Sequence, residues 1–212
     1  MRIAIDAMGG DDAPRAIVAG TVQAARENPS VSELFLVGDQ AAIQAELDQC
    51  GSVPSSIKVL HASEVVGMDE RPAIAIRRKK DSSIGRAVEM VKEGRADAVF
   101  SAGNTGAAVA AATLKLRTLD GVERPAIATV FPTQVKPFVL LDAGANTDCT
   151  PTMLVQFAIM GMVYCREILG RENPSVGVLS IGGEDAKGNE ITKETFRLLE
   201  KSGLNFKGNV ES

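Results

Sequence analysis

Residues 3–14, IAIDAMGGDDAP, contain the pattern that decides the fold. The apolar run Ile3–Asp6 predicts a strand, residues 8–11 form a glycine turn, and a helix is expected from Pro14 to about Glu27. Proline is tolerated in a first helical turn, and acidic residues beside it favour the positive end of the helix dipole. A strand, a glycine turn and a helix in this order are typical of α/β proteins.

The same alternation continues along the chain and predicts a mostly parallel sheet with helices on both faces. The connection at residues 132–137 is too short for a helix, so its two flanking runs are expected to pair antiparallel. We expect strands at Ile3–Asp6, Leu34–Val37, Ile57–His61, Ala98–Ser101, Ala126–Phe131, Phe138–Asp142, Val176–Ile181 and Leu204–Val210.

Composition narrows the function classes. A net charge of −4 argues against a nucleic-acid partner, because such proteins need a large basic surface. Cys50, Cys149 and Cys165 show no C-x-x-C spacing, so neither a disulfide framework nor a metal site is signalled, and a reducing, cytoplasmic location is expected. No linker interrupts the 212 residues, which predicts one α/β domain over 1–212. A strand at its very end suggests truncation of the chain at the C-terminus.

Four glycine-rich turns, at residues 8–11, 101–106, 142–147 and 181–184, each follow a predicted strand and precede a predicted helix. Ligands bind at the carboxyl ends of parallel strands, where free backbone N–H groups and helix dipoles favour anions. Glycine also occurs in simple turns, but Asn104 and Asn146, each followed by threonine, add hydrogen-bond donors that a connection does not require. The turns therefore predict a phosphate or oxyanion site.

Other candidates for catalysis are few. The sequence contains no G-x-x-x-x-G-K-[ST], G-x-G-x-x-G or G-x-S-x-G motif, which disfavours nucleoside triphosphatases, ordinary dinucleotide enzymes and serine hydrolases. Cys149 is the best-placed thiol, although a cysteine in such surroundings is more often a small buried apolar residue. His61, the one histidine, either faces the ligand edge or holds a loop.

Two cationic features of the sequence could bind an anion: a run of five cationic residues and a single lysine. Residues 69–83, DERPAIAIRRKKDSS, carry the five, which either steer an anionic partner or form a solvated helix face. Within this run Ser83 is predicted to cap the helix that starts at Ile84. Lys187 lies in a strand-end glycine loop, where it can neutralise a phosphate or an oxyanion or remain a solvated loop lysine.

Together these stretches resemble the bacterial phosphate acyltransferases of phospholipid synthesis, which make acyl phosphate from acyl-carrier protein. The matching segments are IAIDAMGGDDAP, LVGD, DERPAIAIRRKKDSS, ADAVFSAGNTGA, LLDAGAN and VLSIGGEDAKGNE, in the order of the family. The resemblance implies a three-layer α/β/α fold similar to phosphate acetyltransferases and isopropylmalate dehydrogenases, and no cofactor. Members of the family continue beyond residues 209–211, so the resemblance also implies that part of the site is missing here.

The resemblance further implies that inorganic phosphate attacks the acyl thioester directly, without an enzyme nucleophile. Implied partners are acyl-carrier protein, a second copy in a homodimer, and, by peripheral contact at the inner face of the membrane, the glycerol-3-phosphate acyltransferase. Two alternatives stay open, an NAD-dependent dehydrogenase of the isopropylmalate type and a non-catalytic module that binds carrier protein. Expected catalytic residues are Asn104, Asn146 and Lys187, and expected substrate contacts are Gly10, Asp11, Ser101, Thr105, Gly106, Gly144, Gly182, Glu184, Arg77, Lys79 and Ser83, with Arg78 and Lys80 beside them.

Overall fold

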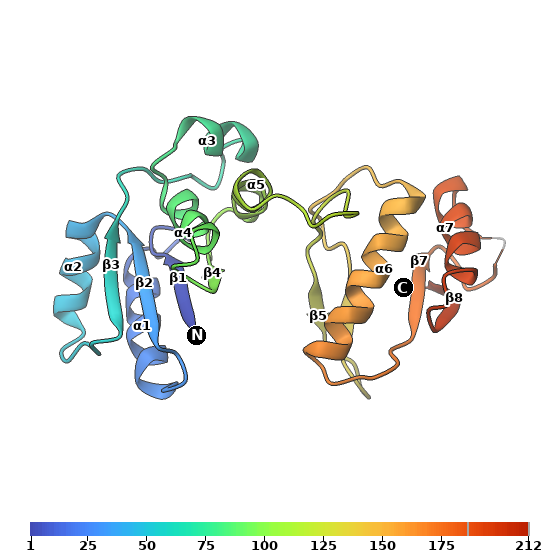
Figure 1. Ribbon diagram of the computed structural model, residues 1–212, viewed down its shortest axis with the longest axis horizontal. Helices are drawn as coiled ribbons and strands as arrows, with labels where there is room; N and C mark the ends of the chain where they lie inside the picture. Colours follow the sequence, from blue (N-terminus) through green and yellow to red (C-terminus); the bar gives the residue numbers. More distant parts are fainter. Residues whose placement is uncertain (186, 212) are drawn as a thin grey trace. The chain divides into compact units, whose positions relative to one another are not determined.

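The computed structural model describes residues 1–185 and 187–211, which divide into an N-terminal unit, Met1–Arg117, and a C-terminal unit, Thr118–Ser212 (Figure 1). The expected single domain over 1–212 stays a prediction. In chain order the elements are β1 (Arg2–Asp6), α1 (Arg15–Glu27), β2 (Glu33–Gly38), α2 (Gln40–Gln49), β3 (Ile57–His61), α3 (Pro72–Arg78), α4 (Ser83–Lys92), β4 (Ala98–Phe100), α5 (Thr105–Lys115), β5 (Thr129–Phe131), β6 (Phe138–Leu140), α6 (Pro151–Glu167), β7 (Val176–Ser180), α7 (Glu190–Glu200) and β8 (Phe206–Glu211).

The N-terminal unit is built on a parallel sheet of four strands in the order β3-β2-β1-β4. Successive side chains of β1 point to opposite faces, as the period of a strand requires. Ile5 packs with α1 and α2 on one face, whereas Ala4 packs with Ala87 and Met90 of α4 on the other. The result is the expected three-layer α/β/α arrangement.

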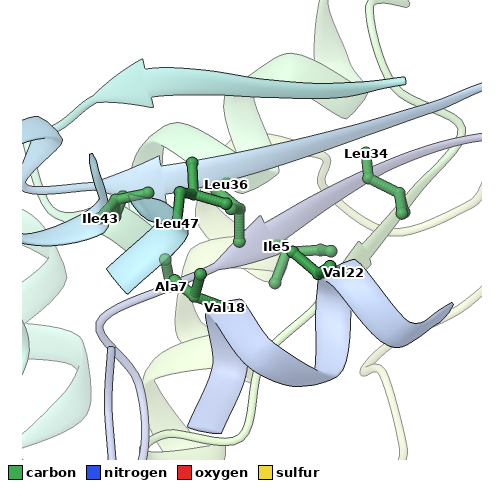
Figure 2. Packing of buried hydrophobic residues seen from close by; sticks show 8 residues of the cluster. All are labelled: Ile5, Ala7, Val18, Val22, Leu34, Leu36, Ile43 and Leu47. Carbon is green, nitrogen blue, oxygen red and sulfur yellow. The ribbon is translucent and has the colours of Figure 1, made fainter. Parts of the chain in front are cut away.

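The first of these cores is built from short aliphatic side chains. Figure 2 shows Val18 and Val22 of α1 and Ile43 and Leu47 of α2 meeting residues from β1 and β2. All of them are almost fully buried, and Val18 and Ile43 have no exposed surface. Burial of each such side chain contributes about 1.5–3 kcal/mol, so this core fixes the edge of the sheet on which the glycine turns lie.

Helix α4 buries an apolar face but begins one residue earlier than predicted. Ile84, Ala87 and Val88 of α4 are buried, as their spacing predicts. Ser82, rather than Ser83, occupies the N-cap position, and its side chain makes no capping hydrogen bond. Ser83 begins the helix and is 1% exposed. Two adjacent serines are equivalent as caps in the sequence, and the backbone hydrogen bond from Ser83 N–H to Glu64 O selects the register.

The C-terminal unit contains an antiparallel pair, β5-β6, and a parallel pair, β7-β8. The antiparallel pairing was predicted, but β5 begins at Thr129 rather than at residue 126. The Ile127 N–H donates to the Asp142 carboxylate at 2.7 Å, so the residues before β5 are held by a side chain instead of a strand. Phe196 of α7 and Phe206 of β8 meet edge to face with ring centres 5.0 Å apart. In the described part of the chain, no helix is long and apolar enough to cross a bilayer.

Candidate functional site

Two of the four glycine turns meet at one edge of the N-terminal sheet. Because β1 and β4 are parallel neighbours, the turns that follow them lie side by side. A Cβ on Gly103 would lie 2.8 Å from Gly9 Cα, and a Cβ on Gly9 would lie 2.9 Å from Gly103 N. Only glycine permits this backbone contact. The close contact therefore explains why both turns are rich in glycine.

A buried carboxylate holds the two turns together. Asp6, 4% exposed at the end of β1, accepts a hydrogen bond from Ser101 Oγ at 2.8 Å and one from Met8 N–H at 3.3 Å. The Ser101 hydroxyl in turn accepts a hydrogen bond from Gly103 N–H at 3.2 Å. The sequence reasoning did not select Asp6, although an acidic residue at the end of an apolar strand, directly before a glycine turn, is a recognisable signal.

Asn104 is fully engaged by the protein itself. Its Oδ1 accepts a hydrogen bond from Ala107 N–H at 3.0 Å, which caps α5. Its Nδ2 donates to Gly67 O at 3.1 Å and to Met68 O at 3.2 Å, which ties residues 67–70 to the start of α5. This geometry makes Asn104 a positioning residue at the site edge, and its catalytic role stays a prediction.

The remaining predicted residues of this edge surround the amino end of α5. Gly10 has a φ of +109°, which side-chain-bearing residues rarely adopt, and Asp11 beside it is exposed. Thr105 is exposed at the first position of α5, and a Cβ on Gly106 would lie 2.6 Å from Pro72 Cγ. Gly106 therefore allows α3 to approach α5. The helix dipole directs partial positive charge toward the same edge.

The cationic run divides into exposed and engaged groups. Arg77, Arg78 and Lys80 are exposed, whereas Lys79 forms an ion pair with Glu70 and donates to Val65 O at 2.6 Å. The hydrogen bond from Lys79, followed by one from Gly67 N–H, holds the pKa of Glu70 below its usual value. Lys79 thus holds the turn before α3 in place. The cations of this run that remain exposed to an anionic partner are Arg71, Arg77, Arg78 and Lys80. Ser83, also an expected contact, lies in the core of the unit instead.

In the C-terminal unit, the 142–147 turn is organised by Asp142. Its carboxylate accepts hydrogen bonds from Ile127 N–H and Asn146 N–H, each at 2.7 Å, and from Asn146 Nδ2 at 3.1 Å. Burial raises the pKa of Asp142, but these hydrogen bonds outweigh it and keep the pKa below its usual value. Asn146 Nδ2 also donates to Pro125 O at 2.9 Å. Gly144 is exposed at the tip of the turn with a φ of +107°.

The last glycine turn brings three predicted residues together. A Cβ on the buried Gly182 would lie 2.8 Å from Glu184 Oε2 and 3.1 Å from Lys187 Cγ. Lys187 is exposed, and its N–H donates to Glu184 O at 3.0 Å. Within the described residues, Ser180 Oγ is buried without a hydrogen-bond partner where β7 leads into this turn. Unpaired buried polar atoms are costly, so this turn offers binding capacity to a polar ligand or to water.

Two further candidates have structural explanations. His61 Nδ1 accepts a hydrogen bond from Gln40 N–H at 3.3 Å, so the ring holds the start of α2. Burial, reinforced by the negative charge of Asp142, raises the pKa of the Cys149 thiol, which keeps the thiol protonated and weakly nucleophilic. The described residues include no group of His, Cys, Asp and Glu side chains arranged to hold a metal ion.

Two solved phosphotransacetylases have a fold similar to that of this chain. The phosphotransacetylase from Streptococcus pyogenes is similar with a TM-score of 0.73 and 17% identity, over 100% of this chain and 68% of that chain. The EutD phosphotransacetylase from Staphylococcus aureus is similar with a TM-score of 0.67 and 18% identity, again over 100% and 68%. At these identities the likeness shows the fold.

Sequence relatives show the family. The phosphate acyltransferase of Clostridium acetobutylicum is 48% identical over 211 residues, which are 100% of this chain and 63% of the relative. That of Desulfitobacterium hafniense (strain Y51) is 53% identical over 211 residues, 100% of this chain and 62% of the relative. The chain thus spans less than two thirds of the length of either protein. A family model described as fatty acid synthesis protein matches residues 1–212. The chain therefore belongs to the phosphate acyltransferase family of fatty acid synthesis proteins.

Proposed function

We propose that the protein takes part in the transfer of a fatty acyl group from the thioester of acyl-carrier protein to inorganic phosphate. The observation that carries this proposal is the pair of interlocked glycine turns, Gly9 against Gly103, at the carboxyl edge of β1 and β4. Backbone N–H groups and the amino end of α5 suit a phosphate at that edge. The names of the relatives support the same reaction.

The reaction needs positioning and charge stabilisation more than a protein nucleophile. A phosphate oxygen attacks the carbonyl carbon of the thioester and forms a tetrahedral oxyanion. The carbon–sulfur bond then breaks, which gives acyl phosphate and a thiolate that takes up a proton. Holding phosphate against the carbonyl removes much of the entropic barrier, and preorganised donors stabilise the oxyanion.

The chain supplies these functions through distinct groups. Asp6 fixes the Ser101 hydroxyl and the Met8 N–H, so it acts as a positioning residue for both turns. Gly10, Asp11, Thr105 and Gly106 surround the phosphate, and Asn104 keeps the start of α5 in place. In the C-terminal unit, Lys187, with Gly182 and Glu184 beside it, supplies a positive charge that can neutralise an anionic substrate group. Asn146 and Gly144 shape a further substrate contact.

Acyl-carrier proteins are strongly acidic, which suits the exposed cations Arg71, Arg77, Arg78 and Lys80. The protein works as a homodimer in the cytoplasm. It delivers acyl phosphate by peripheral contact to the membrane glycerol-3-phosphate acyltransferase, for phospholipid synthesis. We infer these partners from the family resemblance. For acyl-carrier protein, the exposed cations add a physical reason, because they attract an acidic partner.

The test measures thiol release from long-chain acyl-carrier protein with and without phosphate, with hydroxylamine to trap acyl phosphate. The chain and the full-length Clostridium acetobutylicum relative are assayed in parallel. Lys187→Ala should lower phosphate-dependent release about 100-fold, whereas Lys201→Ala, at an exposed lysine of the same unit, should leave it unchanged. Carrier-protein binding without release by the chain would favour a non-catalytic binding module. If neither protein releases thiol in a phosphate-dependent way although both are folded, the acyltransferase function is contradicted.

A further inference from the structure

The turn that carries Lys187 is held by a residue of the last strand, Asn209. Asn209 Nδ2 donates a hydrogen bond to Glu184 O at 2.8 Å. The same carbonyl oxygen accepts a hydrogen bond from Lys187 N–H at 3.0 Å. A carbonyl oxygen can accept both hydrogen bonds because it has two lone pairs. The backbone of Lys187 is thus linked through one oxygen atom to a side chain of β8.

An irregularity in β8 directs the Asn209 side chain toward this turn. Val176 of β7 pairs with Phe206 of β8. Val178, two residues further along β7, pairs with Asn209, three residues further along β8, so β8 contains one extra residue in this interval. Gly208 before it has a φ of +94°. Without the extra residue, the Asn209 side chain would point to the opposite face of the strand pair. Bulges that re-aim a side chain in this way are common beside functional sites.

Packing stability alone does not explain an asparagine at this position. Asn209 and Phe206 lie on the same face of the strand pair, because their partners in β7 are two residues apart. That face packs against α7, where Phe206 meets Phe196. Among the described residues, Asn209 Oδ1 is buried without a hydrogen-bond partner, which costs at least as much stability as the hydrogen bond from Nδ2 contributes. An apolar side chain would pack here without that cost, so the hydrogen bond to the turn explains the amide.

We propose that Asn209 is a positioning residue that holds Lys187 in place for the anionic substrate group. The inference rests on the proposed acyl transfer and adds to it a residue outside the glycine turns. The side chain of Lys187 passes close to Gly182, since a Cβ there would lie 3.1 Å from Lys187 Cγ. Loss of the hydrogen bond to Glu184 O would therefore free both the backbone and the side chain of Lys187 to move.

The first test measures the position of the turn without using activity. Asn209→Leu keeps the branched shape of the side chain and removes its donor. Endoproteinase Lys-C should cleave this variant after Lys187 about two- to tenfold faster, as expected for the loss of one hydrogen bond from a turn that opens locally. Cleavage after the exposed Lys136 is the internal reference and should not change. The urea midpoint should stay the same or rise, because the unpaired Oδ1 is removed.

A matched control uses a second asparagine near the other end of β8. Asn205 Nδ2 donates to Asn173 O at 3.2 Å, so Asn205→Leu removes a comparable hydrogen bond away from the turn. This change should leave cleavage after Lys187 as it is. If Asn209→Leu also leaves that cleavage unchanged, or if it lowers the urea midpoint and speeds cleavage after Lys136 as well, the positioning role is wrong.

The second test connects the position of Lys187 to the proposed reaction. Asn209→Leu should lower phosphate-dependent thiol release by up to about 100-fold. It should cause no further loss in a chain that already carries Lys187→Ala, because both changes remove the same function. Independent, additive losses would contradict action through Lys187. If cleavage after Lys187 is faster as expected but neither the chain nor the full-length relative releases thiol, Asn209 holds the turn and the acyl-transfer proposal is wrong.

Discussion

Replacing Gly103 by alanine is expected to force the two glycine turns apart. The new Cβ would lie 2.8 Å from Gly9 Cα, whereas carbon atoms in contact prefer about 3.5–4.0 Å, so one backbone must move by at least about 0.7 Å. Overpacking of this kind costs about 1–3 kcal/mol of folding stability. A displacement approaching 1 Å at the proposed phosphate site should also lower the transfer rate by up to about 100-fold.

Urea unfolding and phosphate-dependent thiol release measure the two effects of Gly103→Ala. Gly20→Ala is the matched control, because Gly20 lies exposed within α1 and a Cβ there would meet nothing within 4 Å. That change should stabilise the protein by about 0.5–1 kcal/mol and leave transfer unaffected. If Gly103→Ala is as stable and as active as the unchanged protein, the interlocked turns do not form the site.

Three further changes test separate parts of the structure. Asn104→Ala removes the cap of α5 and the hydrogen bonds to residues 67–70, so urea unfolding should show a loss of about 1–2 kcal/mol; an unchanged midpoint would contradict the positioning role. Charge reversal of Arg77 and Arg78 should slow association with acyl-carrier protein in stopped-flow and weaken its salt dependence, and unchanged kinetics would exclude that surface. Arg2 lowers the pKa of Asp97 from 3.8 to about 2, so Asp97 contributes stability that is present above its unfolded pKa and is lost as pH falls from about 4 to 2. Asp97→Asn should flatten acid unfolding in that window, and an identical profile would contradict the assignment.

Much of the fold could be predicted because strand and helix periods are local properties of the sequence. The strand at Ile57–His61 and the helix that ends at Glu27 lie where apolar spacing and turn residues predict them, and β6 starts at Phe138 as predicted but ends at Leu140 instead of Asp142. Strand order was not predictable, because the register of β1 between β2 and β4 depends on packing between residues distant in the sequence. The shortened β5 has the same kind of cause, since a distant carboxylate binds the Ile127 N–H.

The sequence predicted which loops form the candidate site better than it predicted the roles of individual side chains. Strand-end glycines identified the edge where Gly9 and Gly103 touch, but Asp6 looks in the sequence like the last residue of a strand. Asn104 and Lys79 have the chemistry of ligand-binding groups, and the structure uses them to hold residues 67–70 and Glu70. Which polar group binds the protein and which binds a ligand depends on tertiary contacts that spacing does not encode.

The most direct test of the central claim is the fate of phosphate oxygen in the transfer reaction. Phosphate labelled with heavy oxygen is supplied with long-chain acyl-carrier protein, and the acyl phosphate is analysed intact by mass spectrometry, because hydrolysis at the carbonyl carbon would return the bridging oxygen to phosphate. Direct attack by phosphate predicts a labelled oxygen between phosphorus and the acyl carbonyl, and thiol release that requires phosphate. Thiol release without phosphate, which transfer of the acyl group to the protein first would give, would contradict the account.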